Sequence, residues 1–69
     1  MENDLPIGLA MKLSQSQDGM RRFAGLSAGD RANVIRYIGQ SVTGDDAKRR
    51  INSAMSGLES GDMSFLSSL

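Results

Sequence analysis

The chain contains no cysteine and no histidine. Without cysteine it has no disulfides and no thiol nucleophile, and without either residue the usual Cys/His zinc sites and imidazole general bases are excluded. A small secreted domain usually adds disulfides because its core alone is marginal, so their absence favours a reducing compartment. The composition therefore predicts a cytoplasmic protein.

Long apolar runs are also missing. No stretch approaches the ~18 apolar residues of a membrane-spanning helix. The N-terminus, MENDLPIGLAMKL, is acidic where a signal peptide is basic, and Pro6, Gly8 and Lys12 interrupt its apolar residues. We therefore expect a soluble chain with no membrane association.

Charge of one sign does not dominate either. The 69 residues include eight Lys plus Arg and eight Asp plus Glu, so the net charge is near zero. This balance argues against an overall electrostatic attraction to nucleic acid. Residues 21–50, however, hold seven bases and three acids, a local excess of +4, while each flank carries −2. This basic middle region leaves nucleic-acid association as an alternative function.

Aromatic and β-branched residues are few, and most apolar residues are Leu, Ala, Met and Ile, which favours helix over sheet. We predict a first helix at about 6–14 and a second at about 17–24. Ser27 is the expected N-cap of a third helix, whose apolar face carries Val34, Ile35, Ile38 and Val42. Thr43 is the expected N-cap of a fourth helix, which Gly61 closes.

The predicted fold is all-α, a compact bundle of about four short helices in a non-parallel arrangement. Residues 1–61 form the single helical domain, and residues 62–69 form a flexible C-terminal tail that either packs back on the bundle or stays disordered. Met11, Met20 and Met55 are interpreted as flexible core filler. The expected core consists of Leu9, Leu13, Phe23, Leu26, Val34, Ile35, Ile38, Ile51, Ala54, Met55 and Leu58.

The charged stretch VTGDDAKRRI, residues 42–51, offers two interpretations. Asp45 and Asp46 could belong to a catalytic or metal site, but adjacent helical residues point about 100° apart and do not converge. Following Thr43, they fit the first turn of a helix, where the macrodipole favours negative charge. We therefore predict no catalytic, metal-binding or cofactor-binding residues, no cofactor and no enzymatic activity.

Arg31 lies on the apolar side of the third helix, three residues before Val34. A charge near a core needs a partner, so we expect a structural ion pair with an acid or a helix C-terminus. The leading function is a small protein-interaction module that binds a partner protein or itself. Its surface is expected to use the apolar tail or the residues Arg36, Tyr37, Lys48, Arg49 and Arg50.

One known pattern resembles the spacing of these residues over about positions 4–61. It comprises Leu5-Pro6, Phe23, Leu26-Ser27, Arg31, Val34-Ile35, Tyr37-Ile38, Arg50-Ile51, Ala54, Leu58 and Gly61. The chain resembles the C-terminal helical domain of the YdeI/OmpD-associated family, the bacteriocin-protection proteins, and related short bacterial proteins. It departs at Ser41-Val42 and Asp46-Ala47, where that family has Ala-Lys and Thr-Arg pairs. The resemblance implies an all-helical, non-enzymatic bacterial protein linked to stress or bacteriocin tolerance, without a chemical mechanism.

Overall fold

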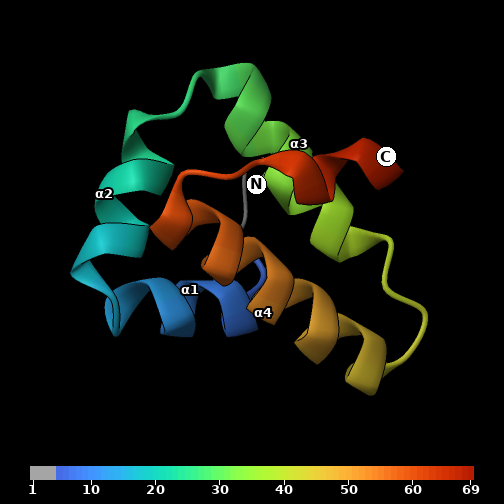
Figure 1. The fold of residues 1–69 in the computed structure, drawn as a ribbon. Coiled ribbons are helices and arrows are strands. Elements are labelled where there is room, and N and C mark those ends of the chain that lie inside the picture. Colours follow the sequence, from blue (N-terminus) through green and yellow to red (C-terminus); the bar gives the residue numbers. More distant parts are fainter. Residues whose placement is uncertain (1–4) are drawn as a thin grey trace.

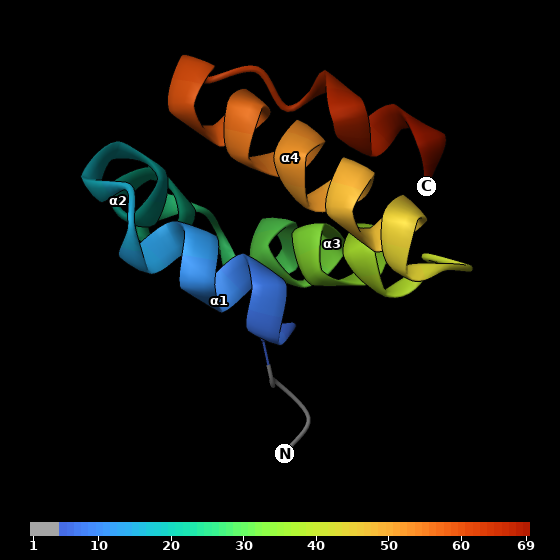
Figure 2. The same cartoon turned by 90° about the horizontal axis from the view of Figure 1, so that it is seen from below.

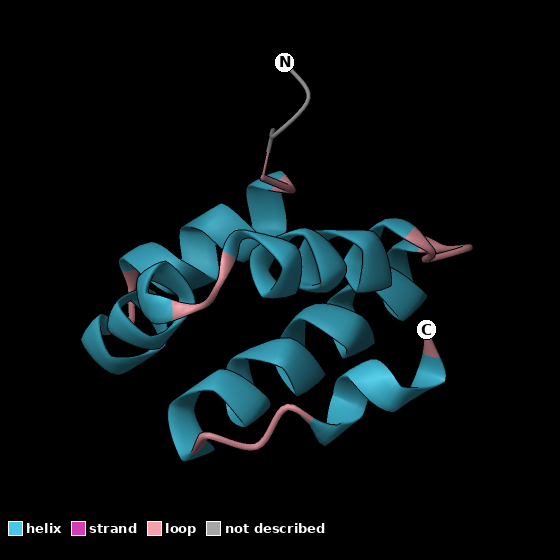
Figure 3. Ribbon diagram, turned by 90° about the horizontal axis from the view of Figure 1, so that it is seen from above, coloured by secondary structure: helices cyan, strands magenta, loops and turns pink. Residues whose placement is uncertain are grey.

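The computed structural model describes residues 5–69, which form four α-helices and a short 3-10 helix (Figure 1). Within these residues every element is helical and the rest is loop (Figure 3). The all-α prediction is confirmed. The elements are α1 (Ile7–Ser14), α2 (Gln17–Gly25), α3 (Ala28–Gly39), α4 (Gly44–Ser60) and η1 (Ser64–Ser68).

Side-chain caps fix the starts of three helices. The Thr43 hydroxyl accepts a hydrogen bond from the Asp46 amide at 3.0 Å, and the Ser27 hydroxyl accepts one from the Asp30 amide at 3.1 Å. Ser16 caps α2 in the same way, through the Gly19 amide. Each cap satisfies an amide that the first helical turn leaves unpaired. The predicted N-caps of α3 and α4 are therefore confirmed.

Gly61 ends α4 in the left-handed conformation, with φ 76°. The Asp62 amide donates to the Gly57 carbonyl at 2.8 Å and the Gly61 amide donates to the Leu58 carbonyl at 3.3 Å. This pair of bonds is a Schellman motif, which most residues other than glycine would strain. The motif reverses the chain and directs residues 62–69 back over the bundle.

Helix α4 is the central element, because it contacts α1, α2, α3 and η1. In Figures 1 and 2, α1 runs beside α4 and in roughly the same direction, whereas α3 crosses it in the opposite sense. The contacts enclose one apolar core. Its buried members are Leu9, Leu13, Phe23, Val34, Tyr37, Ile38, Ile51, Ala54, Met55 and Leu58.

Most of the predicted core is buried, and the exceptions are informative. Leu26 and Ile35 are half-buried at its edge. Met11 and Met20 were wrongly interpreted as core filler, since their side chains are 57% and 44% exposed. On α2 the buried positions are Gly19 and Phe23, which are four residues apart on one face. Met20 therefore points away from the face that packs against α4.

Val42 was also wrongly placed on the apolar face of the third helix. Helix α3 ends at Gly39, and the Ser41 hydroxyl donates to the Ile38 carbonyl at 2.5 Å. The helical period stops there, so Val42 lies in the α3–α4 loop and is 88% exposed.

The segment after α4 packs on the bundle, which is one of the two arrangements that the sequence left open. Helix η1 contacts α3 and α4. Met63, Phe65 and Leu66 lie partly buried against the core, and the Phe65 ring meets the Tyr37 ring edge-on, with centroids 5.2 Å apart. No helix in residues 5–69 is long and apolar enough to cross a membrane.

Candidate functional site

The exposed apolar side chains concentrate near the start of α1. Leu5 is 37% exposed, Ile7 is 79% exposed and Met11 is 57% exposed. Ile7 and Met11 are four residues apart, so they share the outward face of α1, while Leu9 and Leu13 point into the core. Nothing in residues 5–69 covers this outward face. We call Ile7 and Met11 the outer α1 face.

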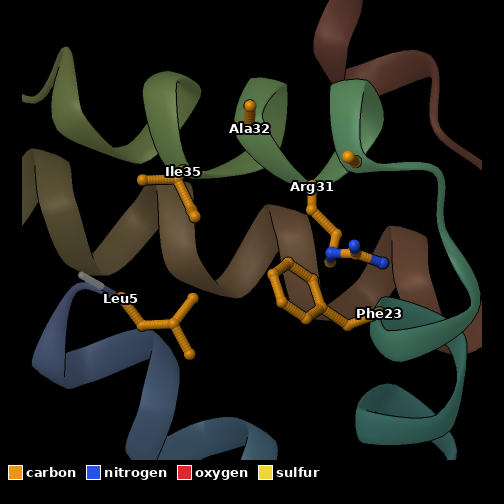
Figure 4. A pocket seen from close by; sticks show the side chains of 6 residues that line it. Leu5, Phe23, Arg31, Ala32 and Ile35 are labelled. Carbon is orange, nitrogen blue, oxygen red and sulfur yellow. The ribbon is translucent and has the colours of Figure 1, made fainter. Parts of the chain in front are cut away.

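A first depression borders this segment on the side of α2 and α3 (Figure 4). We call it the Arg31 groove. Its volume of about 240 Å³ is below the range of about 300–1,000 Å³ usual for small-molecule pockets, and it suits one or two aliphatic side chains of a partner. The groove is lined by Leu5, Phe23, Ala28, Arg31, Ala32 and Ile35.

Arg31 holds the corner between α2 and α3 together. One guanidinium nitrogen, Nη1, donates to the Leu26 carbonyl at 2.5 Å and to the Ala24 carbonyl at 3.2 Å. No carboxylate of the described residues lies within ion-pair distance of it. Of the two partners that the sequence suggested, the structure therefore has the helix C-terminus, where carbonyl oxygens favour a cation.

A second depression runs between α1 and α4, and we call it the α1–α4 groove. Its volume is about 280 Å³. A Cβ on Gly8 would lie 2.7 Å from the end of the Ile51 side chain, so the missing side chain at Gly8 lets Ile51 reach the surface of α1. Met11 adds an exposed apolar wall. The groove is lined by Gly8, Met11, Lys12, Gln15, Lys48, Ile51 and Asn52.

The two cations of this groove, Lys12 and Lys48, have no carboxylate partner among the described residues. Arg21 pairs with Asp18, and Arg49 and Arg50 both pair with Asp46. The cations without a carboxylate at ion-pair distance, among the residues described, are Lys12, Arg22, Arg31, Arg36 and Lys48. Arg31 binds carbonyls instead, and two of the others, Lys12 and Lys48, are exposed and line the α1–α4 groove together.

Only some of the residues that the sequence predicted for the partner surface are exposed in the structure. Tyr37 is only 8% exposed and belongs to the core, so its placement on that surface was wrong. Arg50 packs with its guanidinium carbon 4.8 Å from the centre of the Tyr37 ring and donates to the Tyr37 carbonyl at 2.9 Å. It therefore ties α4 to α3. Arg36, Lys48 and Arg49 remain exposed.

Asp46 organises the start of α4. The Val42 amide donates to its carboxylate at 3.1 Å, and this bond, together with the nearby Arg49 and Arg50, lowers the pKa of Asp46 below its ordinary value. The carboxylate thus caps the helix and binds two arginines. Asp45 lies beside it in the first turn and is exposed. Within residues 5–69 no group of three or more acidic, His or Cys side chains could hold a metal ion.

Sequence reasoning identified Lys48 but not Lys12, Met11 or Ile51 as parts of one surface. The groove arises from the pairing of α1 with α4, which no local pattern in the sequence encodes. Gly8 was the one residue that could have indicated the groove, because a glycine inside a helix weakens the helix and suggests a packing reason. Comparisons with protein-family models, with curated proteins and with solved structures find no match for this chain.

Proposed function

We propose that this chain is a small protein-interaction module that binds a partner protein through the outer α1 face. The observation that carries the proposal is the exposure of Ile7 and Met11 on one helical face. Apolar side chains gathered beside a groove are typical of surfaces that a partner covers. The resemblance to the bacteriocin-protection proteins adds the expectation of a role in bacterial stress or bacteriocin tolerance.

The sizes of the two grooves also favour a protein partner. Each takes a few side chains rather than a whole small molecule; the first is bordered by Leu5, just before α1, and the second is lined by α1 itself. A partner segment that crosses α1 could place apolar side chains in either groove while it covers Ile7 and Met11. Association with nucleic acid is less favoured, because Arg21, Arg49 and Arg50 of the basic middle region are already paired with carboxylates.

A quantitative capture experiment tests the proposal. The tagged protein, an Ile7→Asp/Met11→Asp variant and a Val42→Asp control are each incubated with lysate of the host, with and without nuclease treatment. Val42 is 88% exposed but lies in the α3–α4 loop, so it reports the effect of a new surface charge elsewhere. We expect proteins that the wild type and Val42→Asp retain and that the double variant loses. Circular dichroism checks that all three fold.

Two results would overturn the proposal. One is a set of captured proteins that is the same for the double variant as for the wild type. The other is capture that disappears on nuclease treatment, which would assign the chain to nucleic acid. A gel-shift measurement at low and high salt then provides the independent check, since phosphate contacts weaken as salt rises.

A further inference from the structure

Three charged side chains line the α1–α4 groove and its continuation: Lys48, Lys12 and Glu59. Lys48 and Lys12 line the part of the groove near Gly8 and Ile51, and no acidic residue lines that part. The depression continues along the same two helices, past Lys12, Gln15 and Asn52, to Ser16 and Glu59. Glu59 accepts a hydrogen bond from the Ser16 hydroxyl at 2.6 Å. Lys48 therefore lies toward one end of the depression and Glu59, the only acid among its lining residues, toward the other, while Lys12 lines both parts.

The dimensions fit a short segment of a protein. Lys48 and Glu59 are eleven residues apart on α4, which corresponds to roughly 16 Å along a helix. Between them the apolar part is supplied by Ile51 and Met11, and the rims by Lys12 and by neutral polar side chains. A ligand that fits has an apolar side toward Ile51 and Met11 and negative charges toward Lys12 and Lys48.

We infer that the α1–α4 groove binds an acidic, amphipathic segment of a partner protein, with carboxylates of that segment against Lys12 and Lys48. The inference rests on the proposed function and names the chemistry of the partner. The two ammonium groups are the complementary charges, because no carboxylate in residues 5–69 already neutralises them. Such complementarity selects the partner and speeds the encounter more than it adds affinity.

Selection from a displayed library of random peptides, with the full chain as bait, tests the inference. We expect enriched peptides that combine Asp or Glu with aliphatic residues. Binding of synthetic copies is then measured by fluorescence anisotropy. The Lys12→Glu/Lys48→Glu variant is expected to bind them about tenfold more weakly at low salt, the scale of losing two exposed ion pairs and gaining repulsion.

A matched variant separates the groove from net charge. Arg22→Glu/Arg36→Glu changes the charge by the same amount, at cations that lack carboxylate partners in the described residues and do not line this groove. We expect its binding to stay within about twofold of the wild type, as for charges screened by solvent and salt. An equal loss in both variants would overturn the inference.

Further outcomes of these measurements would also contradict the inference. Enriched peptides that are neutral or basic, or no enriched peptide, would overturn the inference. The proposed function would still stand if the lysate proteins remain dependent on Ile7 and Met11. Self-association that the Lys12→Glu/Lys48→Glu variant abolishes, measured by sedimentation, would assign the groove to a second copy and likewise overturn the inference.

Discussion

Tyr37 shows how a single residue acquires its role from three separate parts of the chain. Its ring is buried on α3, meets the edge of the Phe65 ring from η1, and carries the Arg50 guanidinium from α4. The described residues offer its hydroxyl no hydrogen-bond partner, and no buried polar side-chain atom among them is left unpaired. The hydroxyl therefore reaches water, and the ring does the packing.

Substitutions at Tyr37 should separate the contribution of the ring from that of the hydroxyl. Tyr37→Phe keeps the ring contacts and is expected to change the free energy of unfolding by less than about 0.5 kcal/mol, as for a surface change. Tyr37→Ala removes the ring from the core and is expected to cost about 3 kcal/mol. Urea denaturation measures both. A loss in Tyr37→Phe comparable to that in Tyr37→Ala would contradict the assignment.

Arg31 allows a second test at the scale of one residue. Arg31→Met keeps most of the side-chain length but removes both hydrogen bonds, which go to the Ala24 and Leu26 carbonyls at the end of α2. We expect a loss of about 1–2 kcal/mol, because hydrogen bonds from a charged donor are stronger than neutral ones. Arg31→Lys keeps the charge and should retain part of this stability. Equal stability of Arg31→Met and the wild type in urea would show that the α2–α3 corner holds without the guanidinium.

The sequence predicted the capping and acidic residues of helix starts better than it predicted Tyr37. Ser27, Thr43 and the Asp46 position follow from local chemistry, because a cap and its amide are three residues apart. The apolar stripe of α3 was drawn through Val42, which moved its centre away from Tyr37. Once α3 ends at Gly39, the buried face is Val34, Ile38 and Tyr37. The end of α3 at Gly39 therefore decided which face of the helix is buried.

At the scale of elements, the close approach of α4 to the returning segment depends on Gly57. A Cβ at this position would lie 2.4 Å from the Asp62 carbonyl oxygen and 2.6 Å from the Phe65 ring. The carbonyl is a backbone group, and the amide of the same residue is held by the Schellman motif, so the carbonyl cannot move aside cheaply. Gly57 is thus the residue that lets residues 62–69 lie against α4.

Gly57→Ala should therefore destabilise the protein although alanine is the better helix former. We expect a loss of about 1–3 kcal/mol in the free energy of unfolding, the range for overpacking. Gly39→Ala is the matched control, since nothing lies within 4 Å of its Cβ position, and it should be neutral or stabilising by up to about 1 kcal/mol. In a Phe65→Ala background the cost of Gly57→Ala should shrink. A harmless Gly57→Ala would mean that residues 62–69 do not pack as described.

At the scale of the molecule, the part that the structure describes has the dimensions of a compact domain, with the residues after α4 included. Its radius of gyration is 10.8 Å, against about 11 Å for a compact chain of this size. The four helices could be predicted because each is periodic or capped. The packing of Met63, Phe65 and Leu66 could not, because DMSFLSSL has no period and its position follows from the reversal at Gly61. The two grooves likewise could not be predicted, because each forms only where segments distant in the sequence pack together.

Stability of the whole molecule should depend on pH only at the acid end of the usual range. The chain has no histidine, so no side chain with an ordinary pKa titrates between about pH 5 and 8. Folding lowers the pKa of Asp46 through the Val42 amide and its arginines, and the pKa of Asp62 through the Ser64 amide, both from an ordinary value of 3.8. Protons therefore bind the unfolded chain more readily than the folded one.

The stability that these two carboxylates contribute is present above the unfolded pKa and is lost as the pH falls through the lower folded values. We expect the urea midpoint to stay constant from about pH 5.5 to 8 and to fall below about pH 4. Asp46→Asn/Asp62→Asn should lower the midpoint at neutral pH and flatten the acid decline, because two of the responsible groups are gone. The contrary result is a double variant that loses as much stability on acidification as the wild type. In that case other carboxylates cause the acid sensitivity, and Asp46 does not link the start of α4 electrostatically to Arg49 and Arg50.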